Sequence, residues 1–165
     1  MKKTAPLVLA ATLTLSSFSA DRLNENLRPA EATARGIIHA LRQSSEERFV
    51  AMFPKLSEFH EMMDTNEAFY GLNIEAAKAD FTKTYNEELM PAVRRAYENL
   101  VAEAEKRSID WSEVSIQSVN IPEEATGFSS IAITFEQNGK TFDLVIERSL
   151  MVGEKWKVSQ YVKFI

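Results

Sequence analysis

The sequence feature that most constrains the fold is an Asn138-Gly139 pair between two stretches of alternating apolar residues. Asn-Gly favours a two-residue type I′ turn, because both residues tolerate positive φ. Pairing outward from this turn sets Phe135 opposite Phe142. The register then places six apolar side chains on one face: Ile131, Ile133, Phe135, Phe142, Leu144 and Ile146. A half-buried antiparallel hairpin is therefore predicted.

A third alternating run follows a turn near Gly153-Glu154. Its apolar positions are Trp156, Val158, Val162 and Phe164. Matching this apolar face to that of the preceding strand predicts two cross-strand pairs, Leu150 with Val158 and Ile146 with Val162. In this register Arg148 faces the core and stands opposite Gln160.

The region before the hairpin is predicted to be mainly helical. Apolar positions at three-to-four spacing predict helices over about 29–42, 46–53, 56–64 and 73–88, and a further helical stretch to about 106. Pro91 either kinks one long helix or starts a new one. Residues 114–121 form a further strand. The predicted fold is α+β, with N-terminal helices packed on one face of a curved four-stranded antiparallel meander sheet.

The first residues are typical of a secretory signal peptide. Met1-Lys2-Lys3 is followed by a short apolar stretch and by the small residues before Asp21. We expect cleavage after Ser19 or Ala20, a polar lead-in over 21–28, and one domain over 29–165. The expected product is soluble, in the periplasm or outside the cell, with no membrane association after cleavage. A formal net charge of −5 and the lack of clustered Lys and Arg disfavour nucleic-acid binding.

The sequence contains no recognisable catalytic or cofactor motif. It has no Cys and no nucleophile elbow, and its two histidines, His39 and His60, lie in no metal-ligand spacing. Neither a metal nor another cofactor is therefore expected. Met52, Met62 and Met63 form a stripe with Phe49, Phe53 and Phe59, which fits either core packing or an adaptable apolar binding surface.

The chain resembles the cone-shaped fold of the nuclear-transport-factor-like superfamily. The resemblance lies in the closing stretch GEKWKVSQYVKF, with Gly153, Trp156 and Val158, and in the segment SSEERFVAMFP. The cystatin-like fold fits almost as well. The superfamily includes ketosteroid-isomerase-like and polyketide-cyclase-like enzymes, and also members that only bind ligands or partners. In the isomerase-like relatives an Asp or Tyr inside the cone does acid–base work, which Asp80 or Tyr85 would do here.

We therefore expect a non-catalytic domain that binds a small apolar ligand in its cone, or a protein partner. A small isomerase- or cyclase-like enzyme that uses the cone interior is the alternative. The predicted pocket residues are Arg148, Gln160, Tyr85, Phe81, Trp156 and His60. Arg148 and Gln160 would orient an anionic or carbonyl-bearing ligand. Otherwise Arg148 reaches the end of the sheet or pairs with Glu61 or Glu88. A homodimer is expected through the outer sheet face, at Ala132, Thr134, Thr141, Val145 and Tyr161.

Overall fold

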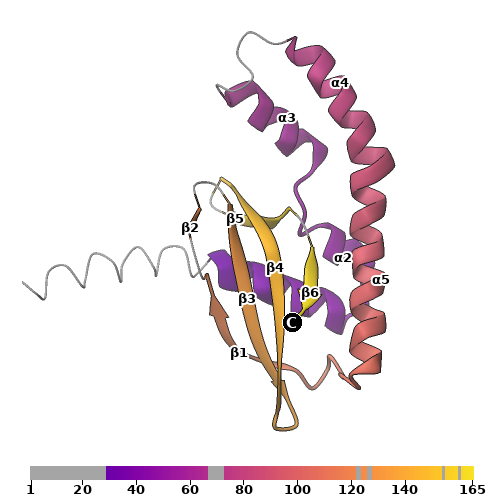
Figure 1. Cartoon of the computed structure of the whole chain (residues 1–165), viewed down its shortest axis with the longest axis vertical. Coiled ribbons are helices and arrows are strands. Elements are labelled where there is room, and N and C mark those ends of the chain that lie inside the picture. The colour runs from indigo at the N-terminus through magenta and orange to yellow at the C-terminus, as the bar shows by residue number, and fades with distance from the viewer. Residues whose placement is uncertain (1–28, 67–72, 122–123, 126–127, 154, 160) are drawn as a thin grey trace, which may run out of the picture.

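The computed structural model describes residues 29–66, 73–121, 124–125, 128–153, 155–159 and 161–165. The predicted signal peptide, the predicted lead-in and Gln160 lie outside these described residues. The described chain confirms the predicted α+β class, with helices first and an antiparallel sheet after them (Figure 1).

The central hairpin has the predicted register. Strand β3 (Phe128–Gln137) pairs with β4 (Lys140–Val152), and Phe135 lies opposite Phe142. Asn138 and Gly139 have φ values of 52° and 76°, as a type I′ turn requires. Asp143 is exposed on the opposite face, where its carboxylate accepts a hydrogen bond from Thr134 at 2.7 Å. The alternation in the sequence therefore assigns both faces correctly here.

Among the described residues, four shorter strands complete a sheet of six strands, two more than predicted. They are β1 (Ser115–Asn120), β2 (Glu124–Ala125), β5 (Lys155–Val158) and β6 (Val162–Phe164). The path through the sheet is β1-β3-β4-β5, with β2 also on β3 and β6 also on β4. The predicted last strand is thus divided into β5 and β6, although the Ser159 amide still donates to the Arg148 carbonyl and the Glu147 amide donates to the Tyr161 carbonyl, both at 2.9 Å.

A bulge in β4 corrects the prediction for Arg148. Ile131 pairs with Ile146, but Ser129 pairs with Ser149, so β4 holds one extra residue at Glu147 and Arg148. The hydroxyl of Ser130 donates to the Glu147 carbonyl at 2.8 Å and fixes the bulge. The bulge reverses the alternation beyond it. Ser149 is therefore fully buried and Arg148 is exposed, so the prediction that Arg148 faces the core is wrong.

The same bulge changes the pairing of the last strands. Ile146 pairs with Val162, as predicted. Val158, however, lies opposite Ser149, and Leu150 lies opposite Lys157, so the predicted Leu150–Val158 pair is wrong. The prediction continued the alternation through the bulge and therefore missed the one-residue shift in register.

In the part of the chain that the structure describes, three short helices follow the first one, and Pro54 lies between the first two of them. The first helix covers residues 29–42 of the described chain. It is followed by α2 (Glu46–Val50), α3 (Leu56–Thr65) and α4 (Ile74–Thr84). Ser45 caps α2 by accepting from the Arg48 amide at 3.3 Å, and Asn73 caps α4 by accepting from the Ala76 amide at 3.2 Å.

Pro91 does not break the long helix. A π-helical turn, η2 (Tyr85–Leu89), joins α4 to α5 (Met90–Lys106), and the Met90 amide donates to the Tyr85 carbonyl. Pro91 lies in the first turn of α5, where its missing N–H is tolerated. Figure 1 shows α4 and α5 as one continuous rod that extends beyond the end of the sheet.

The core lies between one sheet face and two helices. The first helix contributes Ala34, Ile37 and Leu41, and α5 contributes Val93, Tyr97 and Leu100. These side chains meet the buried face of the hairpin, and Phe49 of α2 joins them with no exposed surface. Trp111 packs on Phe135 with ring centroids 5.4 Å apart.

Candidate functional site

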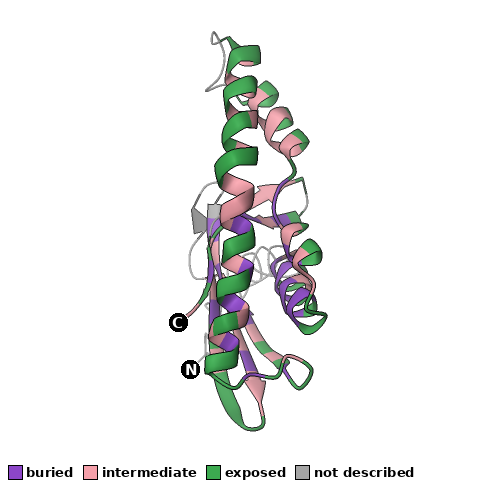
Figure 2. Ribbon diagram, turned by 90° about the vertical axis from the view of Figure 1, so that its right-hand side faces the viewer, coloured by how far each residue is buried: buried purple, intermediate pink, exposed green. Residues whose placement is uncertain are grey.

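Two helices, α3 and α4, extend from the core, and together with Tyr85, the first residue of η2, they are called the arm here. Neither helix contains a buried residue. Figure 2 shows them at intermediate and high exposure beyond the purple core. Their contact is an aromatic cluster of Phe59, Phe81 and Tyr85. Ring centroids lie 4.9 Å apart for Phe59–Phe81 and 6.0 Å apart for Phe59–Tyr85. The apolar side chains of α3 and α4 are thus only partly shielded from solvent by each other.

Tyr85 ties the arm to the core at its base. Its hydroxyl donates to the Pro54 carbonyl at 3.1 Å. Burial raises the pKa of the Tyr85 phenol, and the nearby Glu58 charge raises it further, against an opposing hydrogen bond from the Leu56 backbone. The phenol therefore stays protonated at neutral pH, which suits an anchor better than a general base.

His60 and Asp80 do not form an acid–base pair. His60 Nε2 lies 3.1 Å from the Thr82 hydroxyl, which itself donates to the Lys78 carbonyl. Asp80 is exposed on α4, so it does not occupy the interior position that the isomerase-like resemblance implies. Among the described residues, no three His, Cys, Asp or Glu side chains gather as a metal site would require.

Trp156 lies on β5 of the sheet and in the core, far from the arm residues in the sequence. It is 5% exposed, and its carbonyl accepts from the buried hydroxyl of Thr33 at 2.7 Å. Its indole N–H has no hydrogen-bond partner among the described residues. The predicted pocket residues therefore divide into His60, Phe81 and Tyr85 on the arm, Trp156 in the core and Arg148 on the surface.

An apolar cavity lies at the base of the arm, and the sequence analysis missed most of its residues. It has a volume of about 230 Å³ and lies between the N-terminal half of α5 and the connection from β5 to β6. Its lining residues are Phe53, Leu89, Ala92, Val93, Ala96, Ser159 and Tyr161. Leu89, Ala92, Val93 and Ala96 recur at three-to-four spacing, so two small residues on one helix face were the available signal.

Tyr161 borders this cavity and is 60% exposed. The sequence analysis placed it on the outer sheet face as a dimer contact. On that face Ala132, Thr134 and Val145 are half-buried and Thr141 is exposed. The homodimer through the sheet stays a prediction.

Comparison with known proteins finds no match: no protein family, no curated protein and no solved structure is detectably similar to this chain. None of the described helices has the length and apolar character needed to cross a membrane. The candidate function therefore depends on the geometry of the cavity and the arm.

Proposed function

We propose that this protein is an exported, non-catalytic binding domain that takes a small apolar ligand in the cavity between α5 and the β5–β6 connection. The observation that carries the proposal is the lining, in which one serine and one tyrosine accompany five apolar residues. Small-molecule sites are typically apolar concavities with a few polar groups that set orientation. The hydroxyls of Ser159 and Tyr161 would supply that orientation here.

The volume of the cavity indicates the size of the ligand. An enclosed apolar cavity of about 150 Å³ is known to take benzene in another protein. A cavity of about 230 Å³ suits a single aromatic ring with a short alkyl substituent. Membership of the cone-shaped superfamily, which includes ligand binders, is part of this proposal.

The alternative of a small isomerase- or cyclase-like enzyme has less support. Catalysis needs an acid or base, with its orienting partner, within reach of one substrate position. The described residues around the cavity include no carboxylate or histidine. His60 and Tyr85 lie on the arm and contact Thr82 and Pro54, not each other.

Aromatic probes should raise the melting temperature of the protein. Indole, p-cresol and n-butylbenzene at about ten times Kd should add about 1.4 kcal/mol of stability. For a domain of this length that is a shift of about 3–6 °C, measured by thermal shift with glycerol as the polar control. When the probes are compared at equal concentration, the one that gives the largest shift binds most tightly and identifies the preferred ligand shape.

The variant Ala96→Leu should remove this response, because its added side chain fills the cavity. Ala79→Leu is the matched control, since Ala79 is exposed on α4 and outside the cavity. The proposal fails if no probe shifts the parent protein, or if Ala96→Leu responds as strongly as Ala79→Leu.

A second candidate function, binding of a protein partner, is favoured by the arm. Met62 and Met63 of α3 are only half-buried although α4 packs beside them. Flexible methionines on a half-covered helix are adaptable contact groups. A partner helix laid along the arm would cover both side chains.

Export is the part of the proposal that mass spectrometry checks directly. Expressed in a Gram-negative host, the folded product should begin at Ala20 or Asp21, because cleavage is expected after Ser19 or Ala20. The mass of the intact purified protein gives the answer. Recovery of folded protein that still begins at Met1 would contradict export by this signal.

A further inference from the structure

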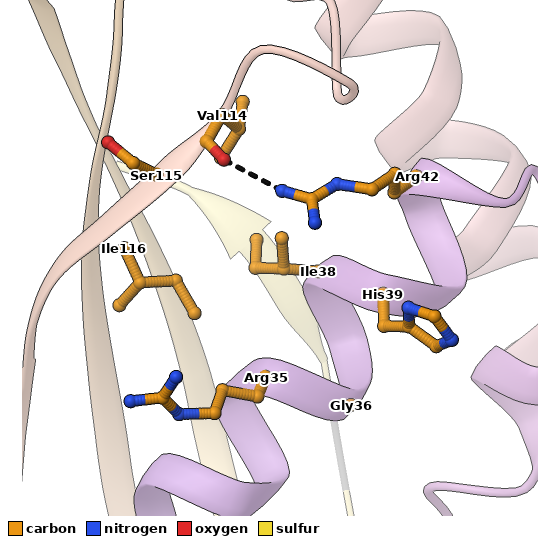
Figure 3. A pocket seen from close by; sticks show the side chains of 8 residues that line it. All are labelled: Arg35, Gly36, Ile38, His39, Arg42, Val114, Ser115 and Ile116. Atoms are coloured by element: carbon orange, nitrogen blue, oxygen red, sulfur yellow. Dashed lines mark hydrogen bonds between the residues drawn. The ribbon is translucent and has the colours of Figure 1, made fainter.

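A second hollow, on the other side of the first helix from α2, carries positive charge. It has a volume of about 640 Å³ and lies between residues 35–42 of the first helix and β1. Figure 3 shows Arg35 and Arg42 reaching from the helix toward β1, with Ile38 between them and Ile116 opposite. Gly36 and His39 also line the hollow, and His39 Nε2 lies 3.0 Å from an Arg48 nitrogen. We call this hollow the arginine groove.

The charge of the arginine groove is only weakly compensated. Its lining residues include no carboxylate. Arg42 donates to the carbonyls of Trp111 at 3.1 Å and Val114 at 2.8 Å, which hold the guanidinium in place without neutralising it. Arg35 has an ion pair with Glu31 at 3.8 Å, and both side chains are exposed, at 71% and 48%. Exposed pairs of this kind contribute little. The groove therefore presents two guanidinium groups, although the chain as a whole has a net charge of −5.

The groove also lies beside a sheet edge. β1 is the terminal strand of the sheet path, and no described strand pairs with its outer side. Ser115 and Ile116, at the start of β1, line the groove. An edge strand offers backbone N–H and C=O groups to an added peptide strand, while side-chain pockets select the peptide sequence.

We propose that the arginine groove binds an extended acidic segment of a partner protein, with an apolar residue between two acidic ones. Arg35 and Arg42 are seven residues apart, which is about 10 Å along a helix at about 1.5 Å per residue. In an extended peptide, acidic residues four apart lie about 13 Å from each other on one face, and the residue midway shares that face. The reach of the two arginine side chains covers the difference, and the middle side chain meets Ile116, which is half-buried, whereas Ile38 beneath it belongs to the core.

The probe is a fluorescein-labelled peptide with the core Glu-Thr-Val-Thr-Glu, titrated with the full-length protein by fluorescence anisotropy. We expect saturable binding that weakens as salt rises from about 0.05 to 0.5 M, because exposed charges are screened. Replacing both glutamates by glutamine, or the valine by asparagine, should weaken binding. No binding at millimolar protein, or equal binding of the glutamine peptide, would overturn the proposal.

The protein variants separate this groove from general charge attraction. Arg35→Gln should weaken binding about threefold to fivefold, since an exposed pair contributes up to about 1 kcal/mol. Arg95→Gln is the matched control, because Arg95 is an exposed arginine of α5 away from the groove, and it should bind as the parent does. Equal weakening by both variants would overturn the assignment.

Inorganic phosphate distinguishes a peptide site from a simple anion site. Added at the ionic strength of the titration buffer, it should displace the peptide no more than chloride does. Displacement at equimolar phosphate would mean that the groove takes a small anion, and would overturn the peptide proposal. A thermal-shift response to apolar probes in the cavity is independent of all these outcomes.

Discussion

Replacing Phe135 by alanine is expected to lower the free energy of unfolding by about 3–5 kcal/mol, the range for a fully buried phenylalanine. Phe135 has no exposed surface. Its ring packs against three others, with centroids 5.4 Å from Trp111, 5.5 Å from Phe142 and 6.3 Å from Phe164. The truncation leaves a cavity that the surrounding side chains can refill only in part. Urea unfolding followed by tryptophan fluorescence gives the value.

Phe142→Ala is the matched control for this measurement. Phe142 lies directly opposite Phe135 and stacks on it, but it is only half-buried and lies at the edge of the cluster. Its loss should therefore cost clearly less, about 1–2 kcal/mol. Equal costs for the two variants would show that cross-strand stacking, and not burial of Phe135, dominates this end of the core.

The hairpin could be predicted from the sequence because every constraint on it is local. The turn residues fix where the strands reverse, and the alternation fixes which side chains face inward. Both were confirmed as far as Ile131 and Ile146. The bulge at Glu147 and Arg148 was not predicted, because the alternation resumes at Leu150 in the same phase; the charged Arg148 at an inward position was the local sign of a shift. At the bulge the hydroxyl of Ser130 donates to the carbonyl of Glu147, a contact between residues that the local pattern does not bring together.

The Met–aromatic stripe illustrates why the candidate site was harder to predict than the fold. Phe49 and Phe53 are buried in the core, whereas Phe59, Met62 and Met63 are half-buried on the arm. The break at Pro54 divides one continuous pattern between two environments. Periodicity shows which side chains share a helix face, but it does not show which neighbour covers that face.

The apolar cavity was hard to predict for the same reason, because periodicity does not show which segment lies beside α5. Ala92 and Ala96 are ordinary helix residues in the sequence, and the cavity forms where α5 lies beside Ser159 and Tyr161, between β5 and β6. Predicting it would have required the division of the last strand into β5 and β6. The alternation predicts a single strand here, and the pocket was therefore expected on the concave side of the curved sheet.

The double variant Phe59→Ala/Phe81→Ala should unfold the arm while the core stays folded. These two rings are the closest aromatic pair between α3 and α4. Fully burying a phenylalanine contributes about 1.5–3 kcal/mol, so the loss of two half-buried rings should cost about 2–3 kcal/mol of local stability. Helices that contain no buried residue open at lower cost than the core. Amide hydrogen exchange by mass spectrometry should therefore show about 30- to 150-fold faster exchange in α3 and α4, at about 1.4 kcal/mol per tenfold change.

The control is Lys83→Ala/Thr84→Ala, two exposed positions on the same helix, which should leave exchange in the arm nearly unchanged. Exchange in β3 and β4 reports the core and should stay slow in both variants, since neither ring belongs to the main core cluster. If the double variant accelerates exchange in the hairpin as much as in the arm, the two parts unfold together. Separate unfolding would mean that a partner could order the arm without any change in the core, because the polar links between them, the Tyr85–Pro54 hydrogen bond and the Glu58–Lys157 ion pair at 3.7 Å, would not couple their unfolding.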